Sequence, residues 1–368
     1  MLATALMGSQ CQKGLSSAAQ QELADAGVNK YIGDFTPVAS SDVGDGWTKH
    51  TFDTDGGNGP ICIAGTPFSA FTRAGDPEKL LIFEQGGGAC WQDFYFCNVL
   101  AEDQEPPTAP VGIWDFDSPD NPFADYSIVY MPYCDGSVFA GDNDVVDANF
   151  PFGPVRFHRG LRNQTAGMDL AAATFPNAKK IVVSGTSAGG VGASGFAPFL
   201  VRFLYGNGVK LSVVNDAGPV TVNPLDVTGI AARAADWQFD QFYPASCTAC
   251  GPDETATAII DWRLENDTTI TEAWYETDGD ETNRFFLMVP TQEEYRDLIL
   301  ADTDAVRANH PLRYKRFIKS GDSSHTALQT PLFNTQTVNG IRLDWWTSLF
   351  LHLPVLTPDL VEDFVPLP

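Results

Sequence analysis

The stretch Lys180-Ile181-Val182-Val183-Ser184-Gly185-Thr186-Ser187-Ala188-Gly189-Gly190 decides the fold that this sequence predicts. Its first residues have the character of a buried strand, and they lead into the Gly-x-Ser-x-Gly pattern of a nucleophile elbow. A serine on such a sharp strand-to-helix turn has a strained backbone, and small flanking residues let neighbouring chain pass closely. We therefore predict that Ser187 is a nucleophile and that the Ala188 N–H stabilises a developing oxyanion at the start of the next helix.

Two other interpretations of this stretch exist. An ordinary glycine-rich turn between a strand and a helix has the same composition. A subtilase serine also lies in a Gly-Thr-Ser context, but that class places its Asp and His before the serine. No suitable pair precedes Ser187 in this chain.

A second glycine-rich turn lies in residues 79–91, with the sequence Lys-Leu-Leu-Ile-Phe-Glu-Gln-Gly-Gly-Gly-Ala-Cys-Trp. In α/β-hydrolases the loop after the third strand carries N–H groups of the oxyanion hole, and glycine lets this backbone approach the substrate oxygen. The competing interpretation is a phosphate-binding loop, but the Gly-Lys-Ser/Thr of such loops is missing. The sequence therefore favours an oxyanion loop.

Composition restricts the partners of this protein. The net charge is −25 and the isoelectric point is near 4.3, so the surface repels nucleic acid and other polyanions. Such charge favours solubility at high salt and is typical of adaptation to a saline medium. The sequence has no run of eighteen or more apolar residues, so it predicts no membrane span. Hydrophobic residues make up 43% of the 368, which is enough for a sizeable core.

The chain has seven cysteines, which suits three disulfides and one left over. The short spacings Cys90–Cys97 and Cys247–Cys250 would also suit zinc, but no histidine stands at a ligand spacing from them. Disulfides predict a secreted or periplasmic protein. Residues 1–9 are mildly apolar without a basic start, which is compatible with the remnant of a signal peptide.

Strands and helices alternate along the chain, which predicts an α/β fold with a mostly parallel central sheet and helices on both faces. The expected strands are residues 79–84, 126–131, 180–184, 210–214, 270–275 and 312–319, and the clearest helices are residues 12–30, 158–175 and 341–353. We expect a helical N-terminal segment at 1–30 and a single catalytic domain at 31–368, with insertions near 92–125 and 225–265. Residues 101–125 look like a surface loop.

A serine nucleophile needs a base and an orienting carboxylate, which follow it in the order acid, then histidine. His325 lies in a polar loop directly after the last expected strand, whereas His310 precedes Pro311 and His352 lies in an apolar helix. We therefore predict that His325 is the base.

The acid is less sharply indicated. The cluster Asp278-Gly279-Asp280-Glu281 follows the strand at 270–275, and Asp216 after the preceding strand is the alternative. A calcium loop or a solvated turn would also explain this cluster, although the spacing of an EF-hand is not met.

Several segments, in this order, resemble the pectin acetylesterase family across roughly residues 47–350. They are the glycine-rich stretch from Glu84 to Cys97, Tyr133-Cys134-Asp135-Gly136, Phe157-His158-Arg159-Gly160, the elbow at 185–190, and Asp216-Ala217-Gly218. The resemblance implies an α/β-hydrolase fold. Two departures are that Ala89 stands where many relatives have tryptophan, and that the acid segment matches loosely.

By this resemblance the triad is Ser187, Asp280 and His325, and the oxyanion donors are the N–H groups of Gly88, Ala89 and Ala188. It also implies that a Cys90–Cys97 disulfide braces the oxyanion loop. With that pair assigned, we expect the pairs Cys62–Cys134 and Cys247–Cys250, with Cys11 left over.

The expected activity is that of a monomeric serine carboxylic-ester hydrolase that needs no metal or organic cofactor. The negative charge disfavours de-esterified pectin as a partner and favours neutral esters, such as acetyl or short acyl esters of neutral glycans. Trp91, Phe139 and Trp237 are the expected substrate-binding residues. The alternatives are a lipase-like or polyester-hydrolase-like enzyme for longer or aromatic acyl groups, a serine peptidase on the same fold, and a non-catalytic carbohydrate-binding relative.

Overall fold

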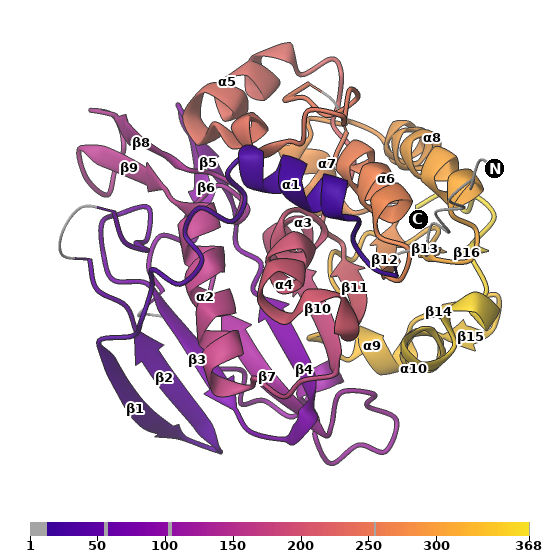
Figure 1. Ribbon diagram of the computed structural model, residues 1–368. Coiled ribbons are helices and arrows are strands. Elements are labelled where there is room, and N and C mark those ends of the chain that lie inside the picture. The colour runs from indigo at the N-terminus through magenta and orange to yellow at the C-terminus, as the bar shows by residue number, and fades with distance from the viewer. Residues whose placement is uncertain (1–12, 55–57, 102–104, 254, 368) are drawn as a thin grey trace, which may run out of the picture.

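A computed structural model describes residues 13–54, 58–101, 105–253 and 255–367 of this chain. Its centre is a ten-stranded sheet with the order β1-β2-β3-β7-β4-β10-β11-β12-β13-β16 (Figure 1). The strands are, in that order, Ala39–Gly44, Trp47–Thr51, Ser69–Arg73, Tyr126–Met131, Asp76–Glu84, Lys180–Thr186, Lys210–Asp216, Thr271–Thr277, Tyr314–Lys319 and Leu360–Val361. The seven strands from β7 to β16 run parallel, and β1 to β3 form an antiparallel extension at one edge. The predicted mostly parallel sheet is confirmed.

Alternation along the strands divides the interior into two apolar layers, because successive side chains of a strand point to opposite faces. In β10, Ile181 and Val183 belong to one buried cluster and Val182 to the other. Leu80 and Ile82 of β4 face the first layer in the same way, and Leu81 faces the second. Both faces of the sheet are therefore covered, as the continuous apolar runs of these strands require.

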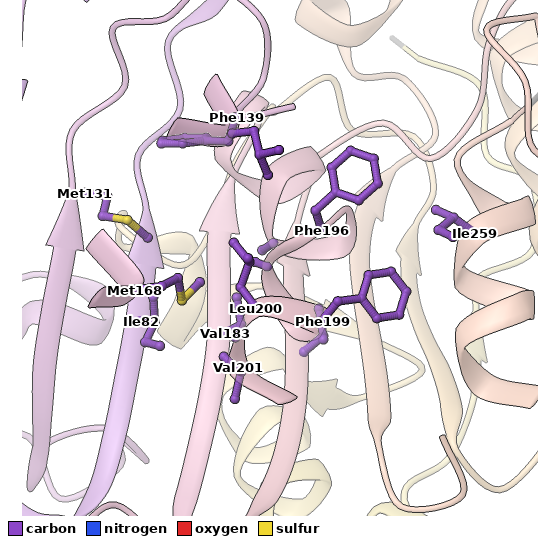
Figure 2. Close-up of a cluster of buried hydrophobic side chains, with 14 of the residues drawn as sticks. Ile82, Met131, Phe139, Met168, Val183, Phe196, Phe199, Leu200, Val201 and Ile259 are labelled. Atoms are coloured by element: carbon purple, nitrogen blue, oxygen red, sulfur yellow. The ribbon is translucent and has the colours of Figure 1, made fainter. Parts of the chain in front are cut away.

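Helices from separate parts of the chain cover the first face. They are α1 (Ser17–Asp25), α2 (Gly160–Thr174), α3 (Ala188–Ser194), α4 (Ala197–Tyr205), α6 (Thr257–Asn266) and α8 (Gln292–Asn309). Figure 2 shows Phe196, Phe199 and Leu200 between the strands and Ile259 of α6, with Met131 and Met168 farther along the same layer. The opposite face is covered by α9 (Leu332–Thr335), α10 (Leu343–His352) and the short helix η1 (Gly112–Trp114).

Smaller elements complete the fold. They are α5 (Val227–Trp237), α7 (Glu281–Phe286), the short helices η2 (Gly206–Gly208), η3 (Phe239–Phe242) and η4 (Pro354–Leu356), and the hairpins β5–β6 (Gly88–Trp91, Phe94–Cys97), β8–β9 (Asn143–Val146, Val155–His158) and β14–β15 (Thr337–Val338, Ile341–Arg342). No described helix is long and apolar enough to cross a membrane.

The prediction of a surface loop at 101–125 is wrong for much of this segment. Ile113, Trp114 and Phe123 are fully or almost fully buried in the second apolar layer. Trp114 packs edge-on against Phe83, with 4.9 Å between the ring centroids. The high content of Pro, Asp and Glu indicated exposure, but three large apolar side chains were enough to hold the segment against the sheet.

The N-terminal helix is shorter than predicted and packs into the first apolar layer. The Ser16 side chain caps α1 by accepting from the Ala19 N–H at 3.2 Å, and Ala19 and Leu23 are buried. The Ser16 N–H donates to Asn266 O at 2.9 Å, which joins this segment to the end of α6. Two predictions concern residues 1–12: a remnant of a signal peptide, and Cys11 as the cysteine left over from the disulfides. These residues lie outside the described part of the chain.

Three disulfides connect described cysteines: Cys62–Cys134, Cys90–Cys97 and Cys247–Cys250. These are the pairs expected above. Cys62–Cys134 closes a loop of 72 residues and joins the connection between β2 and β3 to the segment just after β7, whereas Cys247 and Cys250 are only three residues apart. The two bonds therefore restrict the unfolded chain to very different degrees.

We expect that the double substitution Cys62→Ala/Cys134→Ala lowers the free energy of unfolding by about 4 kcal/mol, because loop-closure entropy grows with loop length. Urea unfolding under non-reducing conditions measures this change. The double substitution Cys247→Ala/Cys250→Ala is the control, for which the same relation gives about 2 kcal/mol. Equal losses in the two variants would contradict the loop-length explanation.

Candidate active site

Ser187 lies on a strained turn at the carboxyl end of β10, immediately before α3. Its backbone has φ 54° and ψ −122°, a region that residues with a side chain rarely adopt. The Ser187 N–H donates to Asp216 O at 2.8 Å, which anchors the turn to the end of the neighbouring strand β11. The conformation is that of a nucleophile elbow.

The glycines of the elbow are required by close backbone contacts. A Cβ atom on Gly185 would lie 2.2 Å from Gly189 O, and one on Gly189 would lie 2.0 Å from Glu84 O. A Cβ atom on Gly86 would lie 2.9 Å from the Ser187 Cβ. The turn after β4 and the turn after β10 are thus in direct contact, and only glycine fits between them.

The sheet topology explains this contact. The chain runs from β4 outward to β7 and then returns to β10 on the other side of β4, so the strand order reverses at this point. In open α/β sheets, ligands bind at the carboxyl ends of the strands where such a reversal occurs. The three glycines follow β4 and Ser187 follows β10, so both sequence-predicted turns lie at this position.

His325 and Asp280 come together on the loops after β13 and β12. His325 Nδ1 lies 2.6 Å from Asp280 Oδ2, and the Asp280 side chain is completely buried. Asp280 Oδ1 also accepts the Asn283 N–H at 2.8 Å as the N-cap of α7, which fixes the carboxylate orientation. Thr277 Oγ1 donates to Ser324 O at 2.6 Å and so ties the histidine loop to the end of β12.

The second ring nitrogen of His325 has no hydrogen-bond partner. Nε2 is buried, and neither Ser187 nor any other described residue donates to it or accepts from it. Catalytic hydrogen bonds are often long before substrate binds, so this geometry is compatible with a base that meets Ser187 only in the substrate complex. The bond from Nδ1 to Asp280 leaves Nε2 as the nitrogen available to take a proton.

The two alternative carboxylates bind other groups. Asp216 is fully buried and accepts the Ala327 N–H at 3.0 Å and the Leu328 N–H at 2.8 Å, so it holds the backbone that follows His325. Asp278 accepts from Gln292 Nε2 and Arg296 Nη1, both at 2.7 Å. Among the described carboxylates, Asp280 alone is hydrogen-bonded to the imidazole of His325.

Burial raises the pKa of Asp216 from its ordinary value of 3.8 to about 7, although the Ala327 and Leu328 N–H groups lower it in part. The neighbouring Glu276 is also completely buried and accepts from Asn283 Nδ2 and Tyr295 Oη, both at 3.0 Å. Burial, and next to it the charge of Asp280, raise the pKa of Glu276 well above its ordinary range. Glu276 was not predicted from sequence, because its strand pattern looks like that of an ordinary core strand.

The glycine-rich loop after β4 continues into the hairpin β5–β6, which the Cys90–Cys97 disulfide closes. Gly88 has φ +78°, and a Cβ atom there would lie 2.0 Å from Phe96 O. Asn98 N donates to Gly87 O at 2.8 Å, and every second N–H of an antiparallel strand points at its partner. In this phase the Ala89 N–H is directed toward Phe96 and the Gly88 N–H away from it.

A cavity of about 170 Å³ begins at Ser187, Gly88, Ala89 and Ala188. Most of the side chains around it are apolar, among them Val191, Phe196, Tyr243, Ile259, Phe286 and Leu287. Trp91 and Trp237 line it as well, and Trp237 Nε1 donates to Cys90 O at 2.8 Å. The arrangement provides an apolar space directly beside the candidate nucleophile.

Phe139 does not line this cavity, so its predicted role in substrate binding is wrong. It is 1% exposed and packs against Tyr133 in the first apolar layer, where Figure 2 labels it. Its neighbours Val138 and Ala140 do line the cavity. Val138 and Phe139 both have positive φ angles, so the backbone departs there from strand alternation, which sequence periodicity does not reveal.

Three further cavity residues were not predicted. Asn283 is buried and bonds Ala217 O through Nδ2, Phe286 ends α7, and Arg233 places its guanidinium 5.0 Å from the centre of the Trp91 ring. Arg233 also pairs with Asp226 at 3.3 Å, so the charged group of this lining is neutralised locally. In the sequence, the signal for the cavity residues of this region is the concentration of aromatic residues in 225–262.

The described residues contain no group of three or more His, Cys, Asp or Glu side chains arranged to hold a metal ion.

The sheet order, the elbow after β10 and the histidine after β13 define the fold class as that of the α/β-hydrolases. Within this class the chain belongs to the pectinacetylesterase family, whose model matches residues 49–257. It is 27% identical over 252 residues to pectin acetylesterase 11 of Arabidopsis thaliana, and the match covers 59% of this chain. The match also spans 59% of the length of this curated relative. The family match includes Gly88 and Ser187 and ends before Asp280 and His325.

We expect Asp216→Asn to change how stability depends on pH. Because the pKa of Asp216 is raised from 3.8 to about 7 in the folded protein, its stabilising contribution is complete below pH 4 and is lost as pH rises toward 7. Urea unfolding from pH 4 to 8 should show wild type losing free energy of unfolding relative to the variant, on the order of a few kcal/mol. The exposed Asp117→Asn is the control. A constant difference between wild type and Asp216→Asn would refute this.

Proposed function

We propose that this chain is a serine carboxylic-ester hydrolase with the triad Ser187, Asp280 and His325. The observation that carries the proposal is the 2.6 Å contact between Asp280 and His325 Nδ1, on the loops after β12 and β13. These strands belong to the same sheet as β10, which is followed by the strained Ser187. Membership of the pectinacetylesterase family supports the same activity. The class explains why these three side chains follow strands in the order serine, acid, histidine.

In this mechanism His325 Nε2 takes the Ser187 proton as the hydroxyl oxygen attacks the ester carbonyl. Asp280 holds the Nδ1–H tautomer and stabilises the imidazolium that forms. The tetrahedral intermediate collapses when its bond to the alcohol oxygen breaks, and His325 returns the proton to that oxygen. Water then attacks the acyl-Ser187 ester, again with His325 as base, and releases the acid.

The oxyanion would be stabilised by N–H groups at the two glycine-rich turns, each of which is typically worth about 3 kcal/mol. Ala188 begins α3, where the N–H groups of the first turn have no partner within the helix, and the Gly88 N–H is directed away from β6. These observations support Ala188 and Gly88 as donors. The direction of the Ala89 N–H toward Phe96 makes it the weaker member of the predicted set.

The proposed substrates are acetyl or short acyl esters of neutral glycans, or similar neutral esters. The net charge of −25 disfavours a polyanion, and the name of the Arabidopsis relative refers to an acetyl ester. A second candidate is the hydrolysis of longer or aromatic acyl esters. The apolar cavity beside Ser187 favours it, because an acetyl group alone leaves most of such a cavity unfilled.

A non-catalytic carbohydrate-binding relative remains the alternative from another class. The strained backbone of Ser187 and the buried Asp280–His325 pair argue against it, because a binding protein has no need for either. The three disulfides support a secreted or periplasmic location.

We expect Ser187→Ala to lower kcat on p-nitrophenyl esters by about 10⁴-fold or more, with an unchanged circular dichroism spectrum. The wild-type rates on acetate, butyrate and palmitate then rank the acyl groups. A preference for acetate supports the deacetylase, and a preference for palmitate supports the second candidate. Equal rates in wild type and variant would overturn the nucleophile assignment.

The two carboxylates near the histidine loop should differ in their effect. Asp280→Asn is expected to lower kcat by about 10⁴-fold, because the amide favours the wrong histidine tautomer. Asp216→Asn removes one acceptor of a backbone pair and is expected to cost about 10-fold, through the position of the histidine loop. Steady-state rates on p-nitrophenyl acetate measure both. The reverse ranking would identify Asp216 as the triad acid.

A further inference from the structure

Four phenylalanines form an aromatic surface between the hairpin β5–β6 and helix α7. We call Phe94, Phe96, Phe285 and Phe286 the aromatic rim. The ring centroids lie 5.8 Å apart for Phe94 and Phe285, 5.7 Å for Phe94 and Phe286, and 5.4 Å for Phe96 and Phe285. Phe96 is 56% exposed and Phe285 is 48% exposed. Two half-exposed phenylalanines in contact are an apolar patch that folding alone does not require.

The aromatic rim is continuous with the cavity beside Ser187. Phe286 lines that cavity, and a Cβ atom on Gly88 of the oxyanion loop would lie 3.1 Å from Phe286 Cζ. Phe94 stacks on the cavity residue Trp91, with 3.9 Å between centroids and 7° between ring planes. One unbroken apolar surface thus leads from the oxyanion loop to the solvent.

The position of the rim relative to His325 indicates which part of an ester it meets. In ester cleavage the alcohol oxygen receives its proton from the histidine, so the alcohol lies on the histidine side of the nucleophile. Helix α7 begins directly after Asp280, which binds His325, and it ends with Phe285 and Phe286. The exposed Phe96 and Phe285 are then placed to meet the alcohol, and the cavity beside Ser187, which Phe286 also lines, is left for the acyl group.

The chemistry of the rim restricts its ligand. Its side chains offer ring faces and edges and no hydrogen-bonding group, so recognition depends on stacking and burial. Asp93 and Glu281 flank the rim and are exposed, and Arg284 directly before Phe285 offsets one of these charges, so it is the net charge of −25 of the whole protein that disfavours an anionic ligand. An uncharged ring fits both conditions, either an aryl ring or the C–H face of a neutral sugar.

We propose that the aromatic rim binds a ring in the alcohol part of the ester substrate and selects ring-bearing alcohols over linear ones. This proposal rests on the esterase function proposed above, and it adds Phe96 and Phe285 as specificity-determining residues. It also assigns the cavity beside Ser187 to the acyl group and the exposed part of the rim to the alcohol.

Three acetates that share an acyl group and differ in the alcohol test this proposal: ethyl acetate, benzyl acetate and a mono-O-acetylated methyl glucoside. We expect Phe96→Ala and Phe285→Ala each to lower kcat/KM about fivefold for the ring-bearing esters. The rate on ethyl acetate should change less than about twofold. A loss on benzyl acetate alone identifies an aryl platform, and a loss on the glucoside alone identifies a sugar platform.

Trp345→Ala is the matched control, because Trp345 is 53% exposed and lies on α10, far from β5 and β6 in Figure 1. It should leave all three rates unchanged. Equal losses on all three acetates, or no loss on the two ring-bearing ones, would overturn the proposal for the rim.

A binding measurement separates failure of the rim from failure of the esterase assignment. In the Ser187→Ala protein, saturation-transfer NMR should detect the ring protons of benzyl acetate or of the acetylated glucoside, and Phe96→Ala/Phe285→Ala should weaken that signal several-fold. Wild type that hydrolyses none of the acetates while this signal persists would refute the esterase function and retain the rim. An unchanged signal in the variant would refute the rim alone.

Discussion

Asp216 connects the two halves of the candidate site. Its backbone oxygen accepts the Ser187 N–H at 2.8 Å, and its buried carboxylate accepts the N–H groups of Ala327 and Leu328 just after His325. One residue at the end of β11 therefore holds the serine turn on one side and the histidine loop on the other. Together with the bond from Thr277 Oγ1 to Ser324 O, these contacts hold the loop in which Asp280 orients the imidazole. Asp216, the alternative acid in the sequence analysis, thus positions the two turns of the site.

A second constraint is the close packing of glycine turns against the end of β4. The backbone oxygen of Glu84 lies where a side chain on either Gly185 or Gly189 would have to be, so the elbow and the oxyanion loop approach as backbones. This contact brings the Gly88 N–H and Ser187 to one cavity. Strain at Ser187 persists because the parallel strands on both sides of β10 fix the ends of the turn.

Ser187 lies at a cavity lined mainly by apolar side chains, and the aromatic rim extends this surface to the solvent. Apolar side chains from α3, α5, α6 and α7 line the cavity, and the surface continues outward to the half-exposed Phe96 and Phe285. The net charge of −25 disfavours a polyanionic ligand. For the proposed esterase, shape and charge would therefore restrict the substrate more than the proposed triad, since a triad accepts any carbonyl that reaches it.

Local sequence patterns determined the parallel sheet, the elbow at Ser187 and the glycine loop at 86–88. They did so because strand character, glycine requirements and turn position are properties of neighbouring residues. Strand pattern alone left Asp280, Asp278 and Asp216 open, because all three stand at or just after the ends of buried strands, and it was the family resemblance that favoured Asp280. Phe139 and the loop at 101–125 were misassigned because local polarity and aromatic content do not report burial. Only the tertiary structure decided which carboxylate meets His325 and which aromatics line the cavity, because those contacts join residues that are far apart in the chain.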